Sequence, residues 1–163
     1  MLILYWSVAQ SGEKWGMNML SGEYRHSIDL KGRVIVPSKI REEMGGRIVI
    51  TRGLDGCLFG YSEKTWEGIM QKLSSLPYTK SDVRKYTRFM TSGAITLEFD
   101  KQGRINIPNY LNKYASLIRE VVIIGVIDRI EIWSSDNWDK FMDENIESLS
   151  DISENLFNSN LDL

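Results

Sequence analysis

Two arginines, each with an aspartate four residues before it, are the side chains of this sequence best suited to chemistry. Arg33 follows Asp29, and Arg104 follows Asp100. A guanidinium is planar and carries five N–H donors, which suit a carboxylate, a phosphate or the edge of a guanine. The residue types therefore leave two interpretations open, an ion pair with the neighbouring aspartate or a cation presented to a phosphate or a guanine. The two segments read DLKGRVIVP (residues 29–37) and DKQGRINIP (residues 100–108).

Both segments belong to a longer internal repeat. They lie 71 residues apart, and their Asp, Gly, Arg and Pro match in register. Further along the chain the offset becomes 72, which requires one inserted residue. Two matched blocks in one order and at nearly one offset indicate a tandem duplication. The second block pairs Gly53 with Gly125, Tyr61 with Trp133, Ser62 with Ser134, Trp66 with Trp138 and Met70 with Met142.

The aspartate and glycine of each segment are typical of a tight turn. Asp29 can accept hydrogen bonds from backbone N–H groups of the turn, and Gly32 can take a positive φ. The chain is then expected to reverse into a second strand that ends at the proline, and Asp100 and Gly103 are expected to do the same. A half-buried strand should precede each turn, because apolar residues alternate there. These residues are Tyr24, His26 and Ile28 in the first repeat and Ile95, Leu97 and Phe99 in the second.

The remaining pattern predicts short helices and strands in the same order in both repeats. A break at residues 74–77 and a basic helix-like segment, residues 79–90, separate the repeats. Lys80, Arg84, Lys85 and Arg88 make up either a solvated face of that helix or a stripe that follows phosphates. The first repeat should hold a helix over 38–44, strands over 47–52 and 57–61 and a helix capped by Ser62; the second should hold a helix over 109–115, strands over 121–126 and 130–133 and a helix capped by Ser134.

These elements divide the chain into five parts. An N-terminal extension (1–18) has no counterpart before the second repeat, and we expect the working start at Met17 or Met19. Beyond residue 145 the sequence is acidic and rich in Ser and Asn, so we expect it to fray or to be disordered. The parts are the extension, a first module (19–77), a linker helix (78–94), a second module (95–146) and an acidic tail (147–163).

Composition is typical of a soluble globular protein, with 42% hydrophobic and 26% charged residues in a chain of 163. One cysteine, Cys57, excludes an internal disulfide framework and favours the reducing cytoplasm. No apolar run approaches the roughly 18–20 residues of a membrane span. Residues 136–163 carry a net charge of −7, which leaves about +5 on the rest of a chain whose net charge is −2.

The residues of an enzyme active site or a metal site are missing from the sequence. His26 is the only histidine and alternates with core residues of a predicted strand, so we interpret it as a packing residue. One His and one Cys cannot build a zinc site, and neither a Walker loop nor a dinucleotide fingerprint occurs. Asp29 and Asp100 each have an arginine in their own turn, which favours a structural role over proton transfer. We therefore expect neither catalysis nor a cofactor.

Several motifs, taken in order, resemble the MraZ family. Besides the doubled Asp-x-x-x-Arg segment, they are MLSGEYRH at residues 19–26, TRGLDGCL at 51–58, TRFMTSGA at 87–94 and VIIG at 122–125. The resemblance covers about residues 19–145. It implies an α+β, β-rich fold in which two tandem swapped-hairpin β-α-β modules of the AbrB type fuse into one pseudo-twofold, barrel-like protomer.

The resemblance also implies a function. MraZ proteins are bacterial transcriptional regulators associated with the nucleoid, and they assemble into ring-shaped homo-oligomers. They bind direct repeats in the promoter of the division and cell wall gene cluster. By resemblance, the DNA contacts of this chain would centre on Arg33 and Arg104, with Lys31 and Lys101 beside them. The expected partners are double-stranded DNA and further copies of the chain, with no membrane and no small-molecule substrate.

Three functional hypotheses follow. The leading one is a sequence-specific DNA-binding regulator. The second is a ring-forming interaction protein whose DNA binding is incidental, motivated by the acidic tail and the apolar strands. The third, an enzyme on a related barrel, lacks any nucleophile–base pair.

Overall fold

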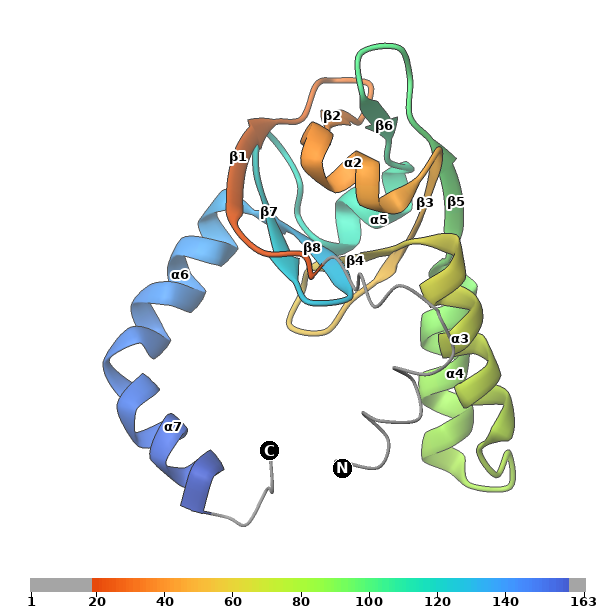
Figure 1. Cartoon of the computed structure of the whole chain (residues 1–163), viewed down its shortest axis with the longest axis vertical. Helices are drawn as coiled ribbons and strands as arrows, with labels where there is room; N and C mark the ends of the chain where they lie inside the picture. The colour runs from red at the N-terminus through yellow and green to blue at the C-terminus, as the bar shows by residue number, and fades with distance from the viewer. Residues whose placement is uncertain (1–18, 159–163) are drawn as a thin grey trace, which may run out of the picture.

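The computed structural model describes residues 19–158, so the predicted extension (1–18) and residues 159–163 lie outside it. The two repeats hold matching elements in the same order (Figure 1). The first holds β1 (Glu23–Ser27), β2 (Arg33–Ile35), α2 (Ser38–Met44), β3 (Arg47–Arg52), β4 (Leu58–Tyr61) and α3 (Glu63–Ser75). After α4 (Ser81–Gly93), the second holds β5 (Ile95–Glu98), β6 (Arg104–Asn106), α5 (Asn109–Tyr114), β7 (Glu120–Val126), β8 (Arg129–Ser134) and α6 (Ser135–Asn145), followed by η1 (Ile146–Ser148) and α7 (Leu149–Asn158).

The strands of the two repeats are shared in one antiparallel sheet. Its order is β1-β7-β8-β4-β3-β5, so β4 of the first repeat meets β8 of the second at the centre. The outer strands are exchanged, because β1 pairs with β7 of the second repeat and β5 pairs with β3 of the first. Each repeat therefore completes the half-sheet of the other.

The two short strands, β2 and β6, pair with each other and form a separate two-stranded ribbon, in which Val34 lies opposite Ile105. The turns before them form as predicted, with φ of 81° at Gly32 and 77° at Gly103. The expected local hairpin, however, is wrong, because β1 does not pair with β2. Turn geometry is encoded locally, whereas a strand of three residues carries too little pattern to specify its partner.

The main core lies between the six-stranded sheet and the ribbon. Val34 and Ile105 point inward from the ribbon and are fully buried, as is Ile123 of the sheet. A smaller cluster lies on the other side of the sheet, where α3, α4 and α6 pack. One apolar face of α3 is partly buried in this cluster, against residues such as Phe59, Met90 and Trp133; it includes Trp66, Ile69 and Leu73.

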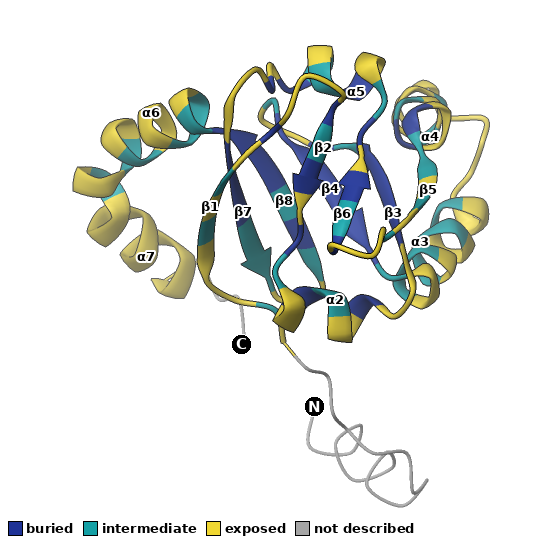
Figure 2. Ribbon diagram, turned by 90° about the horizontal axis from the view of Figure 1, so that it is seen from above, coloured by how far each residue is buried: buried dark blue, intermediate teal, exposed yellow. Residues whose placement is uncertain are grey.

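The predicted helix caps are confirmed. Ser62 Oγ accepts a hydrogen bond from the Thr65 N–H at 3.1 Å, and Ser134 Oγ accepts one from the Asn137 N–H at 3.2 Å. Helices α3 and α4 lie on one flank of the molecule, and α6 and α7 lie on the opposite flank (Figures 1 and 2). The outer face of the ribbon is left uncovered between these flanks.

The structure has η1 and α7 in the region after residue 145, where we expected fraying or disorder. The segment 149–158 is helical, although all of its residues are exposed. Its acidic, Ser-rich composition favoured a prediction of disorder, but the segment has an apolar residue at every third or fourth position, which is typical of an amphipathic helix. None of the helices described is long and apolar enough to span a membrane.

The two faces of the ribbon should differ sharply in their contribution to stability. Ile105→Ala, at a fully buried position, should lower the free energy of unfolding by about 2–5 kcal/mol. Ile35→Ala, on the outer face and 43% exposed, should cost less than about 1 kcal/mol. Urea unfolding of both variants measures the difference. Equal losses would contradict the assignment of the inner and outer faces.

Candidate nucleic-acid interface

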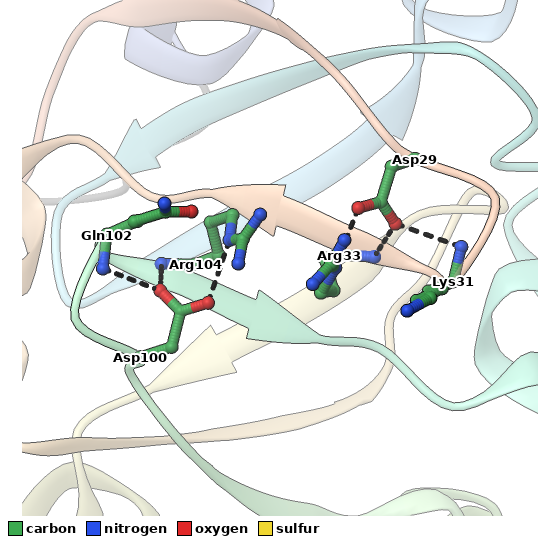
Figure 3. Close-up of polar contacts among 6 residues, drawn as sticks. All are labelled: Asp29, Lys31, Arg33, Asp100, Gln102 and Arg104. Carbon is green, nitrogen blue, oxygen red and sulfur yellow. Dashed lines mark hydrogen bonds and ion pairs between the residues drawn. The ribbon is translucent and has the colours of Figure 1, made fainter.

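Both motif arginines lie on the outer face of the β2–β6 ribbon. Residues directly opposite each other in an antiparallel pair point to the same side. Arg33 is opposite Asn106, and Arg104 is opposite Ile35, while the alternate residues fill the core. Figure 3 shows the two arginines on this ribbon, each near the turn that precedes its strand. One exposed surface therefore presents two guanidinium groups contributed by the two repeats.

The first turn (residues 29–33) is organised by the carboxylate of Asp29. Its Oδ1 accepts hydrogen bonds from the backbone N–H groups of Lys31 and Arg33, both at 2.9 Å. Its Oδ2 accepts the Arg33 Nε–H at 2.7 Å. The backbone closes the turn as well, since the Gly32 N–H donates to the Asp29 carbonyl at 3.0 Å. One side chain thus fixes both the backbone and the guanidinium.

The second turn (residues 100–104) reproduces this geometry. Asp100 Oδ1 accepts the backbone N–H groups of Gln102 and Arg104 at 2.9 Å each, and Oδ2 accepts the Arg104 Nε–H at 2.7 Å. The Gly103 N–H donates to the Asp100 carbonyl at 2.9 Å. Figure 3 shows the six side chains of the two turns at opposite ends of the ribbon. The predicted turn-capping role of both aspartates is therefore present in the structure.

The two interpretations of the arginines are compatible. Each aspartate takes the Nε–H of its arginine, and no hydrogen bond from the terminal Nη groups of Arg33 or Arg104 occurs among residues 19–158. Their side chains are 32% and 25% exposed. The aspartate holds each guanidinium in place and leaves its terminal edge available. That edge is the one that forms bidentate contacts with guanine or phosphate.

Each turn is also locked by the other repeat. The Ile107 N–H donates to the Gly32 carbonyl at 2.8 Å, and the Val36 N–H donates to the Gly103 carbonyl at 3.0 Å. A Cβ on Gly32 would lie 2.7 Å from the Ile107 carbonyl oxygen, so only glycine fits this left-handed position. The duplicated turns therefore depend on each other for their conformation.

The two candidate lysines occupy different positions in their turns. Lys31 and Lys101 are both exposed. At the repeat offset of 71, however, Lys31 matches Gln102, and Lys101 matches Leu30, which is fully exposed at the tip of the first turn. The lysines flank the arginines, as the resemblance implied, without being equivalent to each other.

The other side chains considered from the sequence are the cations of the linker helix, His26 and Cys57, and their contacts or burial favour structural roles. In the basic linker helix, Arg84 donates to the carbonyls of Tyr78 and Thr79, and Lys85 lies 3.9 Å from Asp82. These contacts favour the interpretation as a solvated face. His26 is half-buried in β1. Burial raises the pKa of the Cys57 thiol well above its usual range, so it carries no reactive thiolate.

Comparison with known proteins gives two findings. Two consecutive matches to the family described as "MraZ protein, putative antitoxin-like" cover residues 19–89 and 90–160. The chain is also 52% identical, over 143 residues, to the "Transcriptional regulator MraZ" of Ligilactobacillus salivarius (strain UCC118). That alignment covers 88% of this chain and 100% of the relative. The family matches thus divide the chain into the two tandem units that the internal repeat indicated.

The carboxylates of the turns should make stability depend on acid pH. The backbone N–H and the guanidinium of Arg33 hold the pKa of Asp29 below its ordinary value of 3.8, and Arg104 has the same effect on Asp100. A lowered folded-state pKa stabilises the protein above the unfolded value, and this contribution is lost as the pH falls through the folded value.

The free energy of unfolding should therefore fall below about pH 4, and less steeply in the double variant Asp29→Asn/Asp100→Asn. Asparagine keeps an acceptor for the backbone N–H groups but has no titratable carboxyl group. Urea unfolding at a series of acid pH values measures the two slopes. Identical slopes for the wild type and the double variant would show that these carboxylates do not contribute.

Proposed function

The chain belongs to the MraZ family, and we propose that it is a DNA-binding transcriptional regulator whose Arg33 and Arg104 contact DNA. Lys31 and Lys101 supply further contacts from the same turns, and Asp29, Gly32, Asp100 and Gly103 hold the turns in shape. The name of the relative, a transcriptional regulator, supports the general function. The geometry of the ribbon supports the choice of residues.

One observation carries the proposal, namely that both arginines lie on the same uncovered face of a two-stranded ribbon. The major groove of B-DNA is wide enough to admit such a ribbon. Each guanidinium is held by its aspartate through Nε, so its terminal edge is oriented before DNA arrives. Preorganisation of this kind lowers the entropy lost on binding. Phosphate contacts set the register, and contacts from arginine to guanine edges supply the sequence preference.

Each half of the chain is, in this proposal, a swapped-hairpin module of the AbrB type. The pairing of β2 with β6, and of β1 and β5 with strands of the opposite repeat, supports it. In such an arrangement a turn and the strand that follows it are stabilised by the partner module. The fusion of two modules in one chain then supplies internally what a dimer of single modules would supply by association.

The DNA target is proposed to be the direct repeats upstream of a division and cell wall gene cluster, bound by a ring of copies of this chain in the cytoplasm, on the nucleoid. One protomer offers few phosphate contacts, which gives weak, salt-sensitive affinity. Neighbouring protomers bound to adjacent repeats would raise the avidity without new types of contact. The family resemblance is the source of this part of the proposal.

The distribution of charge over the two flanks supports head-to-tail assembly. Residues 80–93, on the α4 flank, carry four basic residues and one acidic residue. Residues 135–158, which make up α6, η1 and α7 on the opposite flank, carry seven acidic residues and one basic residue. Contacts between two different patches generate rings when the rotation closes.

A second candidate function is an interaction scaffold whose DNA binding is incidental. The observation in its favour is the apolar surface of η1 and α7, where Ile146, Leu149 and Phe157 are each more than half exposed. This function predicts a protein partner that is still captured from a lysate after DNA has been digested. Loss of every captured protein on digestion would argue against it.

Alanine substitutions of the two arginines test the proposed function. Arg33→Ala and Arg104→Ala should each weaken binding to the DNA upstream of the protein's own gene by roughly 5- to 150-fold, because an oriented arginine contact contributes roughly 1–3 kcal/mol. The measurement is a DNA titration at two salt concentrations. Thermal unfolding should show that both variants keep the fold, since the side chains lie on the outer face.

Arg25→Ala is the matched control. Arg25 is an exposed arginine of β1 that forms an ion pair with Asp139 of α6 at 2.8 Å, away from the ribbon. Its loss removes the same charge, and affinity should stay within about twofold of the wild type. Unchanged binding in both ribbon variants, or equal loss in all three, would overturn the proposed role of the ribbon.

A further inference from the structure

The two repeats differ at one position that touches the turns. Arg41 of α2 and Asn112 of α5 lie 71 residues apart and are equivalent. Both donate to the carbonyl before the proline of their own repeat, Arg41 Nε to Val36 at 2.9 Å and Asn112 Nδ2 to Ile107 at 3.0 Å. The repeats have thus kept one structural hydrogen bond while placing different side chains there.

Each of these side chains lies against the turn of the other repeat. A Cβ built on Gly103 would lie 2.5 Å from Cζ of Arg41, and a Cβ built on Gly32 would lie 2.9 Å from Nδ2 of Asn112. The Arg41 guanidinium therefore packs directly on the backbone of the second turn. The first turn has a neutral amide in the same place.

The terminal N–H groups of Arg41 donate no hydrogen bond within residues 19–158. Within residues 19–158 it forms no ion pair, and its single hydrogen bond uses Nε. Its side chain is half-buried, and donors partly withdrawn from water gain most from a new acceptor. Arg33 and Arg104, by contrast, each face an aspartate. A guanidinium that has no carboxylate partner and packs on the turn that precedes Arg104 is suited to a phosphate.

The charge of the two turns is otherwise equal. Residues 29–33 and residues 100–104 each contain one aspartate, one lysine and one arginine, a net charge of +1. Arg41 raises the second turn to +2, whereas Asn112 leaves the first at +1. Among the residues of the two turns and the two side chains packed on Gly32 and Gly103, the difference in charge therefore rests on this one position.

We propose that Arg41 is a third DNA-binding arginine, which holds a backbone phosphate beside the second turn, so that the duplicated turns bind DNA unequally. This inference rests on the proposed function. Arg41 lies on α2, outside the outward-facing side chains of the ribbon, and so it takes a phosphate flanking the groove instead of a base edge. The second turn is then the stronger electrostatic anchor.

The repeat itself supplies the matched variants. Arg41→Asn introduces the residue that the second repeat uses, and it keeps a donor for the Val36 carbonyl. Asn112→Arg makes the reciprocal change. It fits because Arg41 already occupies the equivalent site, and Asn112 Oδ1 has no hydrogen-bond partner to lose. The double exchange restores the total charge but moves it to the first turn.

Binding to the upstream DNA duplex should be titrated over a range of salt concentrations. Arg41→Asn should lower affinity on the order of tenfold and reduce the slope of log K against log salt by about 0.9, the value for one lost phosphate contact. Asn112→Arg should steepen the slope by a similar amount. The double exchange should return the slope to the wild-type value.

The outcomes separate this inference from the proposed function. If the wild type binds and Arg33→Ala binds more weakly, an Arg41→Asn variant with unchanged affinity and slope overturns the role of Arg41 alone. Lower affinity with an unchanged slope, together with a lower melting temperature, would assign Arg41 a purely structural role and also overturn it. If the wild type does not bind the duplex, both proposals fail. Should Asn112→Arg not fold, the slope of Arg41→Asn decides by itself.

Discussion

The candidate interface depends on two carboxylates, each of which accepts three hydrogen bonds. Asp29 and Asp100 each accept two backbone N–H groups and one guanidinium, so the turn and its arginine are fixed together. An exposed ion pair alone contributes little to stability. Here its value lies in orientation, because an arginine that is held by Nε keeps its terminal edge directed away from the aspartate. In the proposed function, the pair is therefore part of the DNA-binding surface more than a stabilising contact.

The duplication supplies the second constraint. Each turn is closed by bonds of its own repeat but is also held by the other one, since each glycine carbonyl accepts a hydrogen bond from the strand end of the other repeat. The ribbon likewise takes one strand from each repeat, and the large sheet exchanges its outer strands. This interdependence puts two arginines on one face at a fixed spacing. It also explains how a difference between the repeats, Arg41 on α2 and Asn112 on α5, can change the charge beside the turn of the opposite repeat.

Local features were predictable from the sequence, whereas the pairing of strands between the repeats was not. The repeat, the glycines with positive φ and the serine caps Ser62 and Ser134 all follow from residue type and spacing. The pairing of β2 with β6 does not, because three residues carry no information about a partner 71 positions away. Helix α7 was not predicted because the acidic composition of the segment was given more weight than the regular spacing of its apolar residues. The contact of Arg41 with Gly103 joins two repeats through space, and no motif within either repeat reports it.

The most direct test of this account is the specificity of Asp29→Asn, measured as the ratio of affinities for the upstream direct repeats and for a scrambled duplex. The substitution makes the protein more positive, so simple electrostatics would strengthen binding to both duplexes. If the carboxylate acts by aiming Arg33, the ratio should fall, on the order of tenfold, while binding to the scrambled duplex holds or rises. An equal gain on both duplexes, with the ratio unchanged, would contradict the account.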